Sequence, residues 1–341
     1  MSYADSVFIC NCINILGKGI SDEDFNVRPK WEDGTPAHTV KNLYVVDKYN
    51  LSKDPIPMVT LRKGGIKNAI DEILWIYQKK SSKLEDLHSH IWDSWDMGDG
   101  TIGKAYGYQI GKKAMYKDPD GTYVARDQMD QVLWDLKNNP GSRSIMTNMY
   151  NFEDLHEMGL RPCAYSMTYN VTKDSEGNMI LNGMLNQRSQ DMLTANNWNT
   201  IQYAALIQML AKVNNMKPGI FTHVIADAHI YDRHIPIILD MIKNYCECIY
   251  EHIEDPAAKR YIDEAYTNLK MNYDLGRYYG IASYAFMRHT FMHKELVDLP
   301  HKNPGLWINP EVKDFYDFTP DDFKLIGYEH DDFSPKIPVA I

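Results

Sequence analysis

Cys163 and Arg188 are two residues of this 341-residue chain whose chemistry could combine to make a nucleophile. Most intracellular cysteines are small, buried, apolar residues. A cysteine beside an arginine differs, because the fixed positive charge stabilises the thiolate, which is the attacking species. Residues 165–171 and 179–186 each have a strand-like composition, and the turn-rich segment 174–178 lies between them. We therefore expect a hairpin that could bring the two side chains together.

The register of this hairpin decides whether the thiol meets the cation. If Val171 pairs with Met179, antiparallel geometry places Cys163 opposite Gln187 and next to Arg188. This register predicts a site in which a nucleophile lies beside a positive charge.

A helix and a strand carry other candidate polar residues. Residues 66–80 have the apolar spacing of a helix, and Glu72 lies at the margin of the apolar stripe. A carboxylate there is either solvated at the helix edge, which is the favoured interpretation, or held half-buried for chemistry. Residues 221–231 have the pattern of a strand. Its period-two alternation places His229 and Tyr231 on one face, so we expect both to reach the same ligand.

The order of the elements indicates the fold class. Strand and helix patterns alternate irregularly, which favours an α+β fold over a regular βαβ array. A further helix is predicted over residues 201–213, with Asn199 and Thr200 as the capping residue types before it. No glycine-rich phosphate loop is present, which argues against a nucleotide cofactor of that kind.

The composition excludes several classes of protein. The formal net charge of −10 argues against broad nucleic-acid binding. No apolar run approaches the roughly 20 residues that cross a bilayer, and the N-terminus lacks the apolar core of a signal peptide. Five cysteines, an odd number without a disulfide framework, fit a reducing cytoplasm.

A segment rich in Tyr, Met, His and charge, residues 245–300, differs from the rest of the chain and is mostly helical in pattern. His289 and His293 are four residues apart and could share a helix face as metal ligands. Because no third ligand accompanies them, we expect no metal.

Motifs along nearly the whole chain resemble the thymidylate synthase family. In the family's order they are Arg28, the helix 72–75, residues 90–95, 105–107, Ser142-Arg143, Pro162-Cys163, 187–189 with Asp191, Asn199, residues 227–231 and the C-terminal 338–341. The resemblance implies an α+β, thymidylate-synthase-like fold in which a mixed β-sheet packs with helices and a homodimer forms through the sheet. It also implies a single domain over residues 1–341, with a helical insertion at about 245–300.

The resemblance further implies one-carbon transfer to C5 of dUMP, with 5,10-methylenetetrahydrofolate as co-substrate. Cys163 would add to C6 of the pyrimidine, which is covalent catalysis. The residues implied to bind the nucleotide are Arg28, Arg188 and Ser189, with Arg143 from the partner subunit, for the phosphate, His229 and Tyr231 for the 3′-hydroxyl, and Asn199 for the base. An amide at Asn199 favours uracil, because it can donate to O4 and accept from N3–H.

Further residues are implied on the folate side. Glu72, Tyr106 and Asp191 would complete the catalytic set, with Glu72 organising waters and proton transfers and Asp191 binding the pterin. The residues implied to bind folate are Ile91, Trp92, Trp95, Leu160, Asp191, Ala195, Trp198 and Ile341.

The chain departs from the family's pattern mainly after Asp191. Ser144 and Ala164 replace an arginine and a histidine that are common in the family, and residues 194–198 replace a Leu-Gly-x-Pro-Phe stretch. The side chains of Thr194, Asn196 and Asn197 could hold an attacking water.

Water addition would yield 5-hydroxymethyl-dUMP and tetrahydrofolate, as in the phage pyrimidine hydroxymethylases, and the sequence favours this outcome. The alternative is hydride transfer, which yields dTMP and dihydrofolate. The intact tail over residues 338–341, with which a synthase seals its site, supports this alternative. A third interpretation is an inactive regulator that binds nucleotide or RNA, against which the retained Cys163, Glu72 and Asp191 argue.

Overall fold

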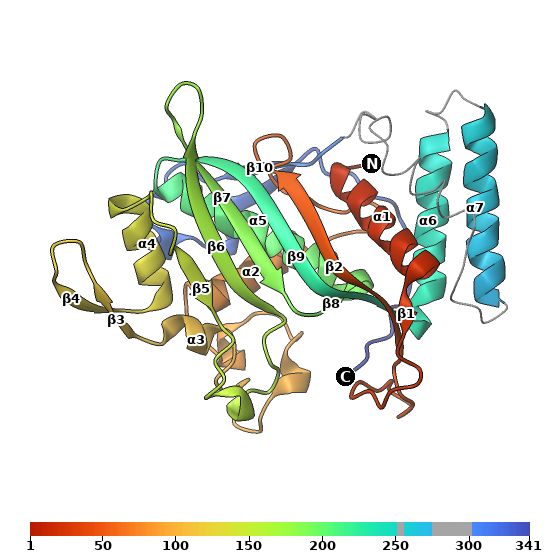
Figure 1. The fold of residues 1–341 in the computed structure, drawn as a ribbon, viewed down its shortest axis with the longest axis horizontal. Helices are drawn as coiled ribbons and strands as arrows, with labels where there is room; N and C mark the ends of the chain where they lie inside the picture. Colours follow the sequence, from red (N-terminus) through yellow and green to blue (C-terminus); the bar gives the residue numbers. More distant parts are fainter. Residues whose placement is uncertain (251–255, 275–301) are drawn as a thin grey trace.

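The computed structural model describes residues 1–250, 256–274 and 302–341, and a mixed sheet of seven strands forms its centre. The strands are β1 (Ile20–Ser21), β2 (Thr39–Asn50), β5 (Met146–Asn148), β6 (Ala164–Lys173), β7 (Met179–Gln187), β8 (Gln190–Asp191) and β9 (Lys217–Tyr231). Their spatial order is β1-β2-β9-β7-β6-β5, and β8 pairs with β9. Strands β7 and β8 run parallel to β9, while the other pairs are antiparallel. The predicted α+β fold with a mixed sheet is confirmed (Figure 1).

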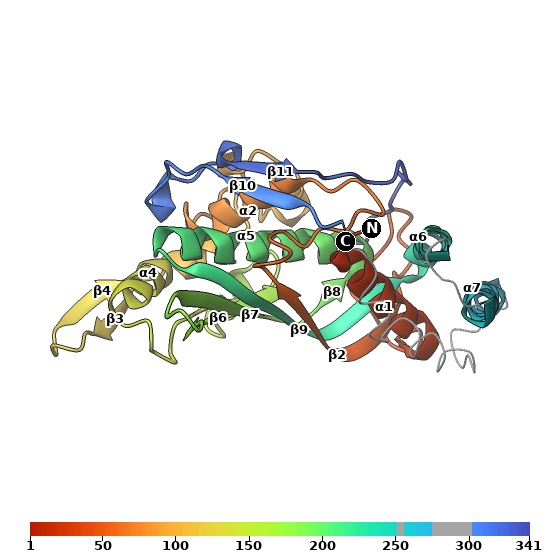
Figure 2. The same cartoon turned by 90° about the horizontal axis from the view of Figure 1, so that it is seen from above.

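Helices and two small two-stranded sheets surround this centre. They are α1 (Tyr3–Lys18), α2 (Ile66–Tyr77), α3 (Gly107–Gly111), α4 (Gln128–Asn138), α5 (Asn197–Val213), α6 (Ile235–Tyr250), α7 (Pro256–Asp274), β3 (Ala114–Lys117) with β4 (Tyr123–Arg126), and β10 (Gly305–Ile308) with β11 (Phe323–Ile326). Figure 2 shows α5 between the sheet and an outer layer that contains α2, β10 and β11. Helix α5 is therefore enclosed on both sides, and an unbroken run of its residues from Thr200 to Ala211 is buried.

The opposite face of the sheet carries exposed apolar side chains. Side chains alternate along each strand, so every second residue of β2, β5, β7 and β9 points away from the core. Four of these outward-pointing residues are apolar and exposed: Val46 (54%), Met146 (47%), Met184 (36%) and Ile220 (38%). No element of the described chain lies over this face in Figure 2. We call these four residues the outer sheet face.

The β6–β7 hairpin forms where the sequence predicts it, but with a different register. Val171 pairs with Leu181, two residues beyond the predicted partner, and a β-bulge near the start of β6 then shifts the register. Arg188 therefore donates its backbone N–H to the carbonyl oxygen of Cys163 at 2.9 Å. The predicted position of Cys163 opposite Gln187 is wrong, yet the thiol and the arginine are still neighbours.

The segment predicted to be a helical insertion is described only in part. Helix α6 ends at Tyr250 and α7 covers 256–274, whereas His289 and His293 lie outside the described residues. Within the described ranges, no helix is long and apolar enough to cross a membrane, and no cluster of potential ligands suits a metal ion.

Candidate active site

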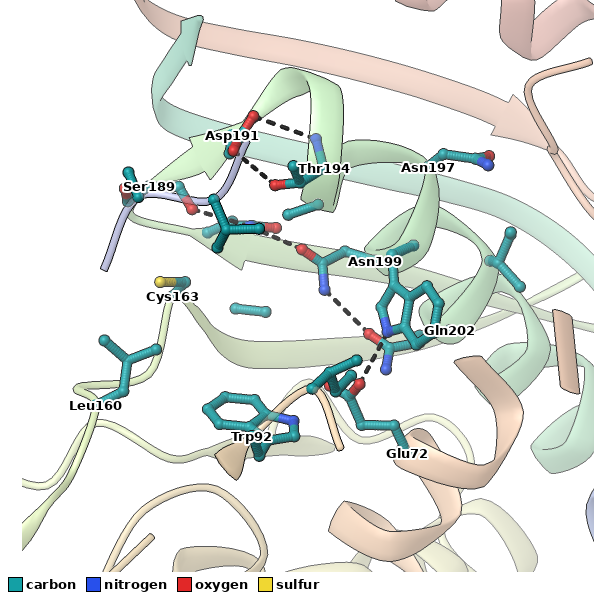
Figure 3. Close-up of a pocket in the computed structure, with 18 of the residues that line it drawn as sticks. Glu72, Trp92, Leu160, Cys163, Ser189, Asp191, Thr194, Asn197, Asn199 and Gln202 are labelled. Carbon is teal, nitrogen blue, oxygen red and sulfur yellow. Dashed lines mark hydrogen bonds between the residues drawn. The ribbon is translucent and has the colours of Figure 1, made fainter. Parts of the chain in front are cut away.

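A cavity of about 830 Å³ lies where β6, β7 and the start of α5 meet loops from the first half of the chain. It brings together residues that are up to 312 positions apart in sequence, from Arg28 to Ala340. The predicted site residues that line it are Arg28, Glu72, Ile91, Trp92, Trp95, Tyr106, Leu160, Cys163, Arg188, Ser189, Asp191, Thr194, Ala195, Asn197, Trp198, Asn199, His229 and Tyr231. Figure 3 shows Cys163, Asp191, Asn199 and Glu72 around this space.

Three predicted residues do not line the cavity of their own chain. Arg143 is exposed elsewhere on the surface. Asn196 is 3% exposed and buried behind the wall. Ile341 is half-exposed and is fixed by its main chain, because its N–H donates to the carbonyl oxygen of Lys30 at 3.0 Å and its carbonyl accepts from the Lys30 N–H at 2.8 Å. The neighbouring tail residues 339–340 line the cavity instead.

The nucleophile candidate lies beside a cation, while burial opposes the formation of its thiolate. Nη2 of Arg188 lies 3.6 Å from Sγ of Cys163, and the same guanidinium donates to the carbonyl oxygens of Arg161 and Pro162. Burial raises the pKa of Cys163, and the opposing effects of Arg188, Tyr106 and Arg28 do not cancel it. Arg188 lies beside the thiol and lowers its pKa, as expected of a neighbouring cation, but burial has the larger opposite effect.

Tyr106 supports the cysteine from a strained backbone. Its φ of 43° and ψ of −103° are unusual for a residue with a side chain. Its hydroxyl accepts the backbone N–H of Cys163 at 3.0 Å, which fixes the position of the nucleophile. Such strain persists where the surrounding packing over-determines the conformation, and it clusters at active sites.

Glu72 is buried, which corrects the expectation of a solvated helix edge. It is 5% exposed, and its Oε2 accepts a hydrogen bond of 2.9 Å from the indole Nε1–H of Trp198. Burial raises the pKa of Glu72 to about 7, although Gln202 and Trp198 oppose the rise. A carboxyl with a pKa near neutrality is suited to both giving and accepting a proton.

The stretch after Asp191 is helical rather than a loop. Residues 192–196 form a π-helical turn that continues into α5, so the helix begins before the predicted capping residues. The Asp191 carboxylate caps this turn by accepting from the backbone N–H groups of Leu193 and Thr194 at 2.9 and 3.2 Å. Burial opposes ionisation of Asp191, but hydrogen bonding, led by His234, outweighs it and lowers its pKa.

The side chains expected to hold an attacking water already have partners or face elsewhere. The Thr194 hydroxyl donates to Oδ2 of Asp191 at 2.6 Å. Oδ1 of Asn197 accepts the backbone N–H of Val59 at 2.9 Å, and the Asn197 side chain points away from Cys163 in Figure 3. Asn196 does not reach the cavity. In this conformation, Thr194 and Asn197 line the cavity but each has an intrachain hydrogen-bond partner, and Asn196 does not line it.

His229 and Tyr231 share one side of the site, as the alternation predicted. Their rings meet edge to face with centroids 5.2 Å apart. Nδ1 of His229 lies 2.8 Å from Oδ1 of Asp227, which orients the imidazole. Both residues line the cavity and can reach a common ligand.

The sequence reading missed several cavity residues. Arg62 and Lys63 bring two cations to the rim, and Nη2 of Arg62 donates to the Leu193 carbonyl oxygen at 2.6 Å. Gln187 and Gln202 line the floor. Two consecutive glycines, Gly64 and Gly65, follow these cations in the sequence and signal a closely packed segment. A Cβ at Gly64 would lie 2.7 Å from the Met58 side chain.

Comparisons with known proteins agree with this arrangement. The family model described as thymidylate synthase matches residues 7–341. "Thymidylate synthase 1" of Bacillus spizizenii is 38% identical over 323 residues, which cover 94% of this chain and 92% of that protein. The thymidylate synthase of Bacillus phage phi3T is also 38% identical, with the same coverage. The thymidylate synthase of Bacillus licheniformis is 37% identical over 97% of both chains.

A solved structure is similar along the full length. It is the thermostable thymidylate synthase A from Bacillus subtilis, with a TM-score of 0.73, 36% sequence identity and coverage of 99% of both chains. Both the sequence and the fold therefore lead to one assignment: the chain belongs to the thymidylate synthase family.

Proposed function

We propose that this protein is a thymidylate synthase, which converts dUMP and 5,10-methylenetetrahydrofolate into dTMP and dihydrofolate. Membership of the family makes it a methylenetetrahydrofolate-dependent transferase. The observation that carries the proposal is that a single cavity brings Cys163 together with Arg188, the buried Glu72 and the amide of Asn199. These groups supply a nucleophile, a cation, a proton carrier and a base reader.

The nucleotide half of the site follows from the chemistry of its walls. Arg28, Arg188 and Ser189 would bind the phosphate, because guanidinium groups match phosphate oxygens. His229 and Tyr231 would bond to the 3′-hydroxyl. As Sγ of Cys163 bonds to C6 of the pyrimidine, the thiol would pass its proton through ordered water to Glu72, and the electrons of the C5–C6 double bond would move toward C5 and O4.

The folate half of the site fits a flat, partly apolar ligand. The indoles of Trp92, Trp95 and Trp198 line the cavity with Ile91 and Leu160. The ionised Asp191 would accept hydrogen bonds from the pterin ring. When bound, methylenetetrahydrofolate supplies the one-carbon unit and the hydride, while Glu72 exchanges protons with the base through ordered water.

Two considerations favour dTMP over the hydroxymethyl product. Similar proteins from Bacillus species and a Bacillus phage carry the name thymidylate synthase. The polar side chains that would hold an attacking water are engaged in intrachain hydrogen bonds or lie outside the cavity. These observations weigh against the sequence-based preference for water addition, and hydroxymethylation becomes the alternative.

Product analysis tests the proposal. The purified protein is incubated with dUMP and methylenetetrahydrofolate, and the nucleotide and folate products are separated by chromatography. We expect dTMP and dihydrofolate in equal amounts. Hydroxymethyl-dUMP with tetrahydrofolate would support the alternative, and the absence of both products would favour an inactive binder.

We propose further that the protein is a homodimer that forms through the outer sheet face. This face presents apolar side chains from four strands, and no element of the described chain covers it. Such exposed apolar surface is typical of an association site. Arg143 would then act in the partner's phosphate site, since it does not line the cavity of its own chain. Light scattering on the wild type and on Met184→Lys tests the dimer, with a shift toward monomer expected for the variant.

A further inference from the structure

The base-reading amide of Asn199 belongs to a chain of hydrogen bonds that runs back into the core. Oδ1 of Asn199 accepts from Nε2 of Gln187 at 3.1 Å, and Nδ2 of Asn199 donates to Oε1 of Gln202 at 3.0 Å. Figure 3 shows the second of these bonds. On the other side, Oε1 of Gln187 lies 2.8 Å from Nε2 of His223. His223 is fully buried and does not line the cavity.

A backbone carbonyl sets the direction of this chain. Nε2 of Gln187 donates to the carbonyl oxygen of Ser189 at 2.9 Å, and a carbonyl oxygen can only accept. The NH₂ group of Gln187 must therefore face Ser189 and Asn199, and its oxygen must face His223. Burial lowers the pKa of His223 to about 3, so the ring is neutral and carries one N–H. That hydrogen must be on Nε2, because the facing Gln187 oxygen needs a donor.

The direction of these hydrogen bonds determines which donor and which acceptor of Asn199 are left for a base. One lone pair of its oxygen and one hydrogen of its nitrogen are already committed. The second lone pair and the second hydrogen remain for a ligand. In this orientation they match the N3–H donor and the O4 acceptor of uracil, whereas a reversed amide would match the N3 acceptor and the amino donor of cytosine.

We propose that His223 is a positioning residue for uracil specificity: its Nε2–H holds Gln187, and thereby holds the amide of Asn199 in the orientation that reads uracil. This inference rests on the proposed function, in which Asn199 contacts the base. His223 acts without touching the substrate. Its role explains why the core retains a buried imidazole whose Nδ1 has no hydrogen-bond partner in the described chain, an arrangement that costs stability.

Packing alone is the competing explanation for His223. Its ring stacks on Phe221, with centroids 5.9 Å apart and an interplanar angle of 16°. The two explanations differ in their consequences. Loss of packing lowers stability and weakens all ligands equally, whereas loss of the Nε2–H donor frees Gln187 to reorient and weakens discrimination between bases.

Paired binding and kinetic measurements on the full-length protein separate these explanations. The affinities and kcat/KM values for dUMP and dCMP are compared in the wild type, His223→Phe, His223→Gln and Phe221→Leu. We expect His223→Phe to reduce the preference for dUMP over dCMP by about tenfold, because a buried acceptor loses its donor. His223→Gln, whose amide can donate, should recover most of that preference. Phe221→Leu should lower the melting temperature and keep the preference.

Each other result overturns a specific statement. A folded His223→Phe variant with the wild-type preference, or with equal losses for both nucleotides, would overturn the positioning role. If that variant does not fold, ¹⁵N NMR of the wild-type protein can locate the hydrogen on the His223 ring. A hydrogen on Nδ1 would contradict the proposed series of hydrogen bonds. A wild-type protein that carries the hydrogen on Nε2 but binds neither nucleotide would contradict the proposed function instead. The role of His223 in base specificity would then have no basis.

Discussion

The indole Nε1–H of Trp198 donates a hydrogen bond of 2.9 Å to Oε2 of Glu72, and so joins the start of α5 to the middle of α2. Trp198 belongs to the stretch in which the sequence differs from the pattern expected of the family, while Glu72 belongs to one of the motifs that resemble it. A residue of the divergent stretch, Trp198, therefore contacts Glu72, the proposed proton carrier, directly.

Replacing Trp198 by phenylalanine should change the pH dependence of the reaction. The indole stabilises the Glu72 carboxylate, so its loss should raise the pKa of Glu72 further above its present value of about 7. The acidic limb of the kcat/KM profile should move to higher pH. Trp95→Phe is the matched control, because Trp95 lines the same cavity but does not contribute to the pKa of Glu72; an equal displacement in both variants would contradict this account.

Replacing Glu72 by glutamine should separate activity from stability. Activity should fall by about 10²–10⁴-fold, as for loss of a general acid–base group. Burial raises the pKa of Glu72 from about 4.5 to about 7, so the contribution of its protonated form is complete below pH 4.5 and is lost as the pH rises through 7. Above pH 7 the variant should exceed the wild type by up to about 3 kcal/mol in unfolding free energy.

Denaturant titrations at pH 4.5 and pH 8 check this difference. The exposed Glu153, replaced by glutamine, serves as the control and should show no comparable gain. A Glu72→Gln variant that is equally or less stable than the wild type at pH 8 would argue that the carboxylate is better accommodated than its burial indicates.

Mixing two inactive variants should restore activity if Arg143 acts across a dimer. A heterodimer of Arg143→Ala and Cys163→Ala chains contains one site with an intact Cys163 and an intact Arg143 from its partner. Unfolding and refolding the mixture, followed by a dTMP assay, should recover roughly a quarter of wild-type activity if chains associate at random and sites act independently. Recovery no greater than the sum of the separate variants would place Arg143 outside the partner's site.

Removing Ile341 should weaken closure of the cavity. Its main chain forms two hydrogen bonds with Lys30, and Nε2 of His234 bonds to the carbonyl oxygen of Pro338 at 2.8 Å. We expect a higher KM for methylenetetrahydrofolate and a lower kcat. Lys30→Ala is the matched control, since it keeps the main-chain hydrogen bonds; the two variants should differ clearly in steady-state kinetics.

Replacing Asn199 by aspartate should shift the preference from dUMP toward dCMP. An ionised carboxylate only accepts, which suits the amino donor of cytosine better than the O4 acceptor of uracil. Paired kcat/KM values measure the shift. Unchanged discrimination would remove Asn199 as the base reader and, with it, the basis for the role of His223.

The sequence by itself determined the elements and the family. Strand-like composition on either side of a turn identified the strands that became β6 and β7, period-two alternation identified β9, and helical spacing identified α2. These patterns are local, so they can be read without the fold. Retained motifs such as Pro162-Cys163 determined the family and the list of candidate residues.

Only the tertiary structure decided the electrostatic state of those residues and the register between them. Glu72 reads as a helix-edge carboxylate, but Trp198 and Gln202 come from a distant helix and bury it. A β-bulge, which periodicity does not reveal, sets the pairing of Cys163 with Arg188. Likewise, the thiol's raised pKa reflects a balance between burial and distant charges. Burial and register depend on contacts between segments far apart in the chain, which is why local sequence could not provide them.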